Sequence, residues 1–241
     1  MARLSLLHTT DLHGCLTPEQ ASRLREMRRD RAALLLDSGD ALTAPNVAYK
    51  PWTEPVLLRM NEAGYDAMAA GNREFYFRQR GLRRKTREAA FPVLCANLRG
   101  PDGRQLLTPS VLLTSPQGDT VGVFGLMREM IPPGSWMERL AGVRFAPWRP
   151  VAEELAAHLR PQVQWLVALS HLGPEDDEEL ARLCPQLDLV LGGHSHPAQR
   201  LVRRVGATTL VTGLPYLQEL LHIQSTTDNS PSDFSVEAVT L

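Results

Sequence analysis

The sequence lacks a long apolar run and a paired cysteine motif, and each absence excludes a class of protein. No hydrophobic stretch approaches the roughly 20 consecutive apolar residues of a transmembrane helix. The first apolar stretch meets Asp11 before a signal-peptide core can form, so we expect a cytoplasmic protein that does not engage membranes. Three widely spaced cysteines without a Cys-x-x-Cys pair favour a reducing compartment over a disulfide framework.

The sequence also lacks a charge excess, since its formal net charge is only −1. This balance argues against a protein that coats nucleic acid or a membrane surface. A hydrophobic content of 43% is ordinary for a globular protein, and 241 residues suffice for one large α/β domain. No internal repeat, linker or low-complexity tract divides the chain. We therefore expect a single domain over residues 1–241, and the sequence indicates no oligomeric state.

What the chain does have is an alternation of strand-length apolar runs with amphipathic helices, which is typical of a parallel or mixed sheet covered by helices. A helix is expected after Thr17, whose side chain can form a capping box with Gln20. The β-branched residues of 201–241 predict antiparallel strands that close a second sheet. Other strands are expected at 3–8, 32–36, 66–70, 92–96, 111–114, 120–126, 165–169 and 187–191, and helices at 54–63 (capped by Thr53), 151–159 and 175–183.

Potential metal ligands recur where the expected strands end. In α/β sheets, the ends of strands are where ligands collect. Oxygen and imidazole donors without thiolates suit Mn²⁺, Fe or Zn²⁺ in a reactive site rather than a structural zinc. Seven donors exceed the need of one tetrahedral ion, and they suit two ions about 3.5–4 Å apart that share a carboxylate. The seven are Asp11, His13, Asp40, Asn72, His171, His194 and His196.

These motifs resemble the calcineurin-like metallophosphoesterases, closest to the catalytic domain of the 5′-nucleotidase branch. The resemblance rests on Asp11-Leu12-His13, Gly39-Asp40, Gly71-Asn72, His171 and Gly192-Gly193-His194-Ser195-His196, and it covers nearly the whole chain. It implies a four-layer α/β/β/α sandwich of two mixed sheets flanked by helices, with two divalent ions. Manganese is the expected metal, with iron or zinc as alternatives.

The resemblance also implies a division of the ligands between two metals. By position, the first ion would be held by Asp11, His13, Asp40 and His196. The second would be held by Asp40, Asn72, His171 and His194, with Asp40 bridging the two ions. The reaction that this implies is attack on phosphorus by a metal-bound hydroxide.

Two residues depart from the family pattern at the position of the general acid. The family motif places a histidine after the asparagine, and here that position is Arg73; an aspartate that supports this histidine in nucleotidases is here Tyr76. Arginine can bind phosphoryl oxygens in a bidentate manner but cannot give up a proton at working pH. General acid assistance is typically worth about 10²–10⁴-fold. We therefore expect substrates with acidic leaving groups to suffer least, with Arg73 as a phosphoryl contact and Tyr76 as a substitute acid.

The leading hypothesis is therefore a phosphoesterase that hydrolyses a phosphate ester or anhydride in a phosphorylated small molecule or nucleotide. Monoesters, diesters and pyrophosphates all remain open as substrates. The alternative is a catalytically weak or inactive metal-bound scaffold that binds a phosphorylated ligand or a protein. Family nucleotidases carry a C-terminal domain that clamps the base; we expect none here, so base recognition is not inferred.

Several residues near these motifs have a plainer interpretation. His8, His158 and His222 are expected to be structural or surface residues, Cys15 to be a packed thiol, and Arg73 to pair with a carboxylate as readily as to contact substrate. The basic run from Arg78 to Arg87 is expected to be a solvated helix face rather than a rim for an anionic substrate.

Overall fold

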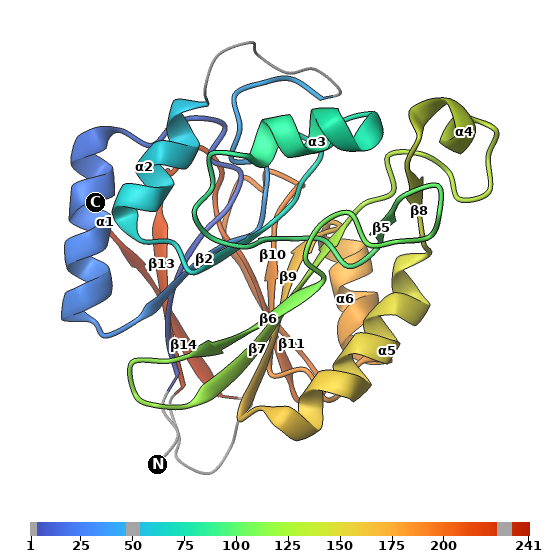
Figure 1. The fold of residues 1–241 in the computed structure, drawn as a ribbon. Helices are drawn as coiled ribbons and strands as arrows, with labels where there is room; N and C mark the ends of the chain where they lie inside the picture. Colours follow the sequence, from blue (N-terminus) through green and yellow to red (C-terminus); the bar gives the residue numbers. More distant parts are fainter. Residues whose placement is uncertain (1–3, 47–53, 226–232) are drawn as a thin grey trace.

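The computed structural model describes residues 4–46, 54–225 and 233–241, and two six-stranded sheets form its centre (Figure 1). The first sheet has the order β14-β13-β1-β2-β3-β4, with β1, β2, β3 and β4 parallel and β13 antiparallel to β1. Its strands are β1 (Ser5–Thr9), β2 (Leu34–Asp37), β3 (Ala67–Ala69), β4 (Val93–Leu94), β13 (Leu220–Ser225) and β14 (Phe234–Val239).

The second sheet has the order β11-β12-β10-β9-β7-β6. The four strands β12, β10, β9 and β7 are parallel, and β11 and β6 are antiparallel edge strands. A separate pair, β5 (Leu98–Arg99) and β8 (Arg144–Phe145), is antiparallel. The strands of the second sheet are β6 (Ser110–Thr114), β7 (Thr120–Met127), β9 (Trp165–His171), β10 (Leu189–Gly192), β11 (Leu201–Val205) and β12 (Thr208–Thr212).

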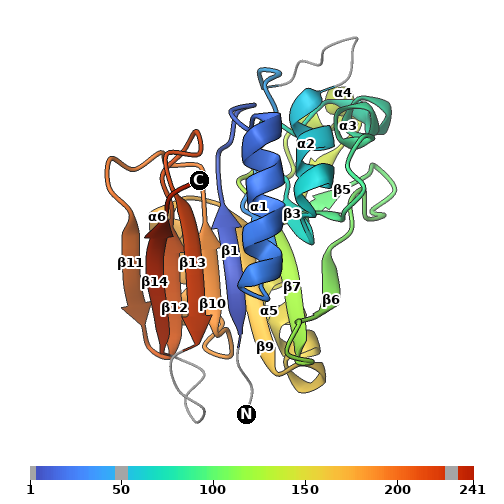
Figure 2. The same cartoon turned by 90° about the vertical axis from the view of Figure 1, so that its left-hand side faces the viewer.

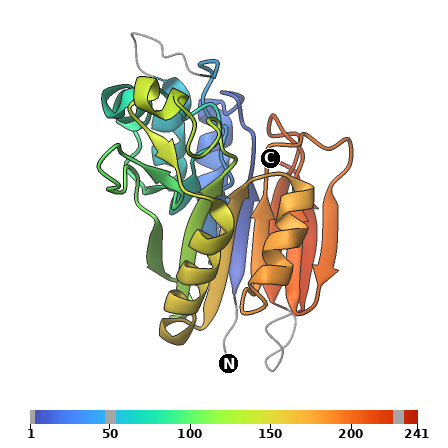
Figure 3. The same ribbon diagram turned by 90° about the vertical axis from the view of Figure 1, so that its right-hand side faces the viewer.

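Helices cover the outer face of each sheet. Figure 2 looks onto α1 and α2, which lie outside the first sheet, and Figure 3 looks onto α5 and α6, which lie outside the second. The short helix α4 and the 3-10 helix η1 lie in connections. The helices are α1 (Pro18–Asp30), α2 (Pro55–Ala63), α3 (Arg78–Thr86), α4 (Met137–Ala141), α5 (Trp148–Leu159), η1 (Arg160–Gln162) and α6 (Pro174–Leu183).

The apolar side chains of the strands alternate between two cores, because successive residues of a strand point to opposite faces. In β1, Leu6 packs between the two sheets and Leu7 packs beneath the outer helices. In β10, Leu189 and Leu191 face the layer between the sheets, whereas Val190 packs with α5 and α6. Three apolar layers therefore separate four layers of structure, which confirms the α/β/β/α sandwich.

Most expected elements appear within a few residues of their predicted bounds. The capping box of Thr17 and Gln20 is present in α1, and β6 and β7 form the expected hairpin. Helix α2 begins at Pro55 with Glu54 at its cap; Thr53, the expected cap, lies outside the described residues. Within the described residues, no helix combines the length and apolar character needed to cross a bilayer.

The C-terminal strands differ from the expectation that they close one sheet. Strands β11 and β12 extend the second sheet, whereas β13 and β14 extend the first. Strand β12 is also parallel to β10 rather than antiparallel. The sequence pattern could not show this division, because the turn between β12 and β13 carries the chain from one sheet to the other.

Candidate metal centre

The seven predicted ligands lie at one end of the two sheets, in loops or at the last residue of a strand. Asp11, Asp40 and Asn72 follow β1, β2 and β3, while His171 ends β9 and His194 and His196 follow β10. Because each group of strands is parallel, their carboxyl ends meet at the same edge. Five of the seven predicted ligands have a positive φ, although none of them is a glycine. Left-handed backbone at such residues costs about 1–3 kcal/mol each and clusters at functional sites.

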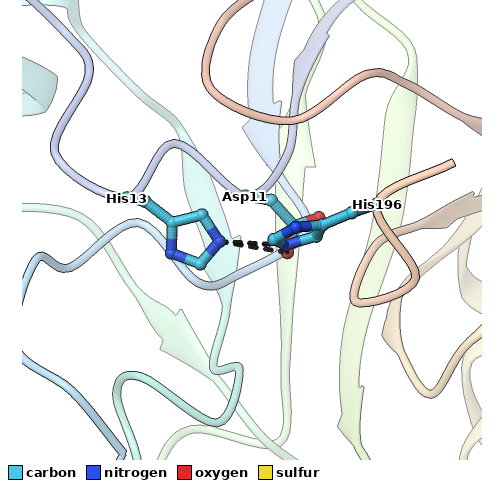
Figure 4. A group of neighbouring side chains, drawn as sticks. All are labelled: Asp11, His13 and His196. Carbon is cyan, nitrogen blue, oxygen red and sulfur yellow. Dashed lines mark hydrogen bonds and ion pairs between the residues drawn. The ribbon is translucent and has the colours of Figure 1, made fainter. Parts of the chain in front are cut away.

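The first group of ligands consists of Asp11, His13 and His196 (Figure 4). The Nε2 atoms of His13 and His196 are 2.9 Å apart, and His196 Nε2 is 3.1 Å from Asp11 Oδ1. His13 Nε2 lies 3.9 Å from the same carboxylate oxygen. These three atoms therefore surround one point, where a cation can be held by all of them.

The second group surrounds His171. Its Nε2 lies 3.3 Å from Asp40 Oδ1 and 3.2 Å from Asn72 Oδ1. Asn72 Oδ1 is also 3.0 Å from His194 Nδ1. Carboxylate oxygens of Asp11 and Asp40 and a nitrogen of His171 lie within 4.8 Å of one another, so the two groups are contiguous.

The orientation of the His171 ring suits a metal ligand. His171 Nδ1 is 2.8 Å from the carbonyl oxygen of Ser38, which can only accept, so this nitrogen donates. In the neutral ring, the lone pair is then on Nε2 and faces Asp40 and Asn72. Ligating histidines characteristically donate their second N–H to a carbonyl in this way. The oxygen and imidazole donors suit Mn²⁺, Fe or Zn²⁺.

Asp40 and His171 influence each other's ionisation. Burial opposes ionisation of Asp40, yet the nearby His171 lowers the pKa of this carboxyl below its ordinary value. Burial likewise opposes a charge on His171, but Asp40 reverses the effect and raises the histidine pKa to about 9. The two groups therefore favour a paired carboxylate and imidazolium when no cation lies between them.

Buried carboxyl groups behind the ligands hold the loops in place. Glu74 is fully buried and accepts hydrogen bonds from the backbone N–H groups of Asp40 (3.0 Å) and Gly71 (2.8 Å). Asp37 accepts from the Thr9 hydroxyl and from the Gly39 N–H. Burial raises the pKa of both carboxyl groups. These interactions fix the two turns that carry Asp40 and Asn72.

A cavity of about 430 Å³ opens beside the ligands. Arg73 lines it, and the Arg73 backbone N–H donates to Asp40 Oδ1 at 2.7 Å. Tyr76 does not line this cavity; its ring lies against Gly81 and lines a second cavity. The roles of both side chains remain predictions. The lining residues are His13, Asp40, Pro45, Asn46, Asn72, Arg73, His194 and His196.

Two neighbours of the ligands were missed by the sequence reasoning. The Tyr216 ring lies 5.0 Å from His13 and 5.4 Å from His196, centroid to centroid. Its N–H also donates to the Asp11 carbonyl at 2.9 Å. No motif marks Tyr216. The second neighbour is Glu74, which directly follows Arg73, so its position in the motif could have identified it. The Asn72 amide donates to Asn46 at 2.8 Å.

The residues given a plainer interpretation mostly lie as expected. His8 and His222 are buried and hydrogen-bonded to Ser38 and Ser5, and His158 is exposed on α5. Cys15 is exposed, so the expectation of a packed thiol is wrong. It follows the left-handed turn at His13 and Gly14, which directs this segment toward solvent.

Comparison with known proteins agrees with this geometry. Residues 4–198 match the model of the calcineurin-like phosphoesterase family. Protein UshA of Yersinia enterocolitica is 30% identical over 222 residues, and a 5′-nucleotidase of Vibrio cholerae is 31% identical; each match covers 80% of this chain. A 5′-nucleotidase precursor from Thermus thermophilus superimposes with a TM-score of 0.79 at 25% identity, covering 99% of this chain and 54% of that one.

The fold and the ligand set thus define a metallophosphoesterase domain, and the chain belongs to the calcineurin-like phosphoesterase family. The resemblance to the 5′-nucleotidase branch is confirmed by these relatives. The family implies divalent metal ions, and five of the seven predicted ligands form the two clusters that could hold a metal ion. The chain spans 40% of the length of the two curated relatives.

Proposed function

We propose that the chain hydrolyses a phosphate ester or anhydride in a nucleotide or another phosphorylated small molecule. The observation that carries this proposal is the convergence of Asp11, His13 and His196 with Asp40 and His171 beside an open cavity. Two divalent ions there, with Mn²⁺ preferred and Fe or Zn²⁺ as alternatives, would activate water and offset the charge of the phosphoryl group. The 5′-nucleotidase relatives support a nucleotide as substrate.

Within this proposal, Arg73 orients the phosphoryl group. Its backbone is tied to Asp40, and its side chain lines the same cavity as the ligands. A guanidinium presents several N–H donors in one plane, so it can hold two phosphoryl oxygens at once. It keeps its proton at working pH and therefore leaves the departing oxygen without an acid.

The rest of the cavity lining points to acidic leaving groups. Apart from Arg73, every titratable residue among the described residues of this lining is an expected metal ligand. With two ions bound, these side chains have no proton to give. We therefore expect aryl phosphates and phosphoanhydrides to be cleaved far faster than alkyl phosphates.

The experiment compares two substrates and two variants at position 73. Protein loaded with Mn²⁺ is assayed with an aryl phosphate and with an alkyl phosphate such as a nucleoside monophosphate. Arg73→His introduces a side chain that can act as an acid, and we expect it to raise the alkyl rate about 10²-fold while the aryl rate changes little. Arg73→Gln, the matched control without charge or acid, should lower both rates.

The same lining motivates a second candidate function, a metal-bound scaffold that binds a phosphorylated ligand or a protein without hydrolysing it. It predicts bound metal and ligand-dependent thermal stabilisation, with no turnover of either substrate. Absence of turnover with Mn²⁺, Fe²⁺ and Zn²⁺ together with such stabilisation would reject the hydrolase and support the scaffold. The cytoplasmic location expected from the sequence stays a prediction.

A further inference from the structure

A second cavity, of about 580 Å³, lies on the segment that follows Arg73, and its lining is dominated by arginine. The chain passes from the metal-ligand cavity to this one within three residues, since Arg73 lines the first and Tyr76 the second. In Figure 1, α3 lies at the end of the molecule to which the strands of the metal centre point. We call this cavity the arginine hollow; Tyr76, Phe77, Arg78, Arg80, Gly81, Arg83, Arg84 and Arg87 line it.

The arginines of the hollow form one stripe along α3. Arg80, Arg83, Arg84 and Arg87 are spaced three and four residues apart, and such residues are neighbours on one face of a helix. The opposite face carries Leu82 and Lys85, which are buried. Lys85 is turned inward and donates to the carbonyls of Pro45 and Phe75, both at 3.2 Å. The helix is therefore fixed in rotation, with its arginine stripe outward.

The stripe concentrates positive charge that the segment itself does not offset. Residues 75–87 hold five arginines and one lysine and no aspartate or glutamate. Each arginine pair at a spacing of three or four residues is mutually repulsive on a helix. Arg87 lies beside Glu88, with Nε and Oε1 2.7 Å apart. A bound polyanion would relieve the repulsion of the whole stripe at once.

We propose that the arginine hollow binds a small polyphosphate, meaning a compound with two or more linked phosphates such as the polyphosphate tail of a nucleotide. Guanidinium groups bind phosphate oxygens in pairs, so several of them in one stripe suit a chain of phosphates better than a single one. The volume lies within the range of small-molecule sites, about 300–1,000 Å³, which favours a small ligand over a nucleic acid. The rings of Tyr76 and Phe77, 6.3 Å apart, form an apolar wall beside the charges.

The test measures binding of sodium tripolyphosphate by titration calorimetry, in a low-salt buffer with EDTA. We expect binding that weakens as salt is added, and that falls at least tenfold in the double variant Arg80→Glu/Arg83→Glu. Each introduced carboxylate lies four residues before a remaining arginine, a favourable helical pairing, so this variant should fold. The control Arg23→Glu/Arg25→Glu makes the same charge change at two exposed arginines of α1 and should bind within twofold of wild type.

Several results would overturn the proposal. Equal binding by wild type and the α3 variant would do so, as would a loss that follows Arg73→Gln instead, because the anion would then occupy the metal-ligand cavity. Inorganic phosphate binding as tightly as tripolyphosphate would remove the requirement for linked phosphates. An oligonucleotide that binds through Arg80 and Arg83 when tripolyphosphate does not would make the hollow a nucleic-acid surface. None of these readouts depends on hydrolysis, so they stand apart from the proposed activity.

Discussion

Single side chains at the strand ends are held by partners that are themselves buried. His171 is fixed by the Ser38 carbonyl, and the turn at Asp40 is fixed by Glu74. Because these partners keep the donor atoms in place before any cation arrives, little ordering remains to be done on binding. We expect such a site to bind metal tightly and to tolerate few substitutions.

Asp40 is the ligand whose loss should matter most, because it lies beside His171 and lines the cavity. The variant Asp40→Asn keeps the shape but removes the charge that two ions would share. We expect the bound metal to fall from two ions to one or none, and the hydrolysis rate to fall at least about 100-fold. Elemental analysis and aryl phosphate assays measure both.

The matched control is His158→Ala, which removes an exposed histidine of α5 that lies outside the ligand set. It should retain the metal and the rate of wild type. An Asp40→Asn protein that keeps two ions and full activity would show that this carboxylate does not bridge them.

At the scale of the elements, the turns after β2, β3 and β10 approach one another closely. Gly71 adjoins the Asp40 side chain and His171, and a Cβ atom added there would lie 2.7 Å from His171 Nε2. A Cβ at Gly193 would lie 3.1 Å from His171 Nδ1 and from the Ser38 carbonyl. The glycines therefore leave the space in which the ligands of different strands meet.

Gly71→Ala should displace Asp40 or His171 and weaken metal binding at least about tenfold, as changes beside ligands commonly do. Metal affinity is measured by competition with a chelator. Gly213→Ala is the control, since the nearest atoms to a Cβ there belong to the side chains of Leu221 and Glu219, at 3.3 Å or more, and neither is a predicted ligand. Unchanged affinity in Gly71→Ala would mean that the turns move apart without cost.

Helix α6 carries a buried carboxyl group, Asp177, that accepts a hydrogen bond from Ser170. Burial raises its pKa to about 7, against the opposing effect of Ser170. In the unfolded chain, the Asp177 carboxyl ionises at about pH 4. Between pH 4 and pH 7 this group is therefore protonated in the folded protein but mostly ionised in the unfolded chain. The contribution of Asp177 to stability is thus complete below pH 4 and is lost as the pH rises through 7.

Asp177→Asn should remove this dependence. We expect the free energy of unfolding of wild type to fall between pH 5 and pH 8 by about 3 kcal/mol more than that of the variant. Urea denaturation at the two pH values measures the difference. Glu154→Gln, an exposed change on helix α5 away from Asp177, should leave the pH dependence as in wild type. Parallel curves for wild type and Asp177→Asn would contradict the prediction.

At the scale of the whole molecule, the layer between the sheets joins the two halves of the site. Leu191 of β10 is fully buried in this layer, beside Leu169 and Val211 of the neighbouring strands. Its carbonyl accepts a hydrogen bond from Ser38 at 2.7 Å, which links the second sheet to the turn after β2. The packing of this residue therefore affects both sheets.

Leu191→Ala should lower the free energy of unfolding by about 2–5 kcal/mol, because it removes buried methyl groups and leaves a cavity. Leu112→Ala, on the edge strand β6 and 49% exposed, should cost far less. Urea denaturation compares the two variants. Similar losses would indicate that the layer between the sheets refills the space.

Much of this arrangement could be predicted from the sequence, and the limits have physical causes. The seven predicted ligands could be singled out because each lies at or just after an apolar run, and their metal-binding role stays a prediction. The four layers followed from the family resemblance. The place of Tyr216 depends on β12 and β13 belonging to different sheets, which no local pattern records. The arginine hollow was not predicted, because a basic run gives the same sequence pattern whether its helix faces open solvent, as we expected, or lines a cavity.

The donors are divided by sheet: Asp11, Asp40 and Asn72 come from strands of one, and His171, His194 and His196 from strands of the other. Neither sheet supplies all of the predicted ligands by itself. An ion bound there would contact side chains from both sheets. Its uptake would therefore report that the two sheets have packed together correctly before any chemistry begins.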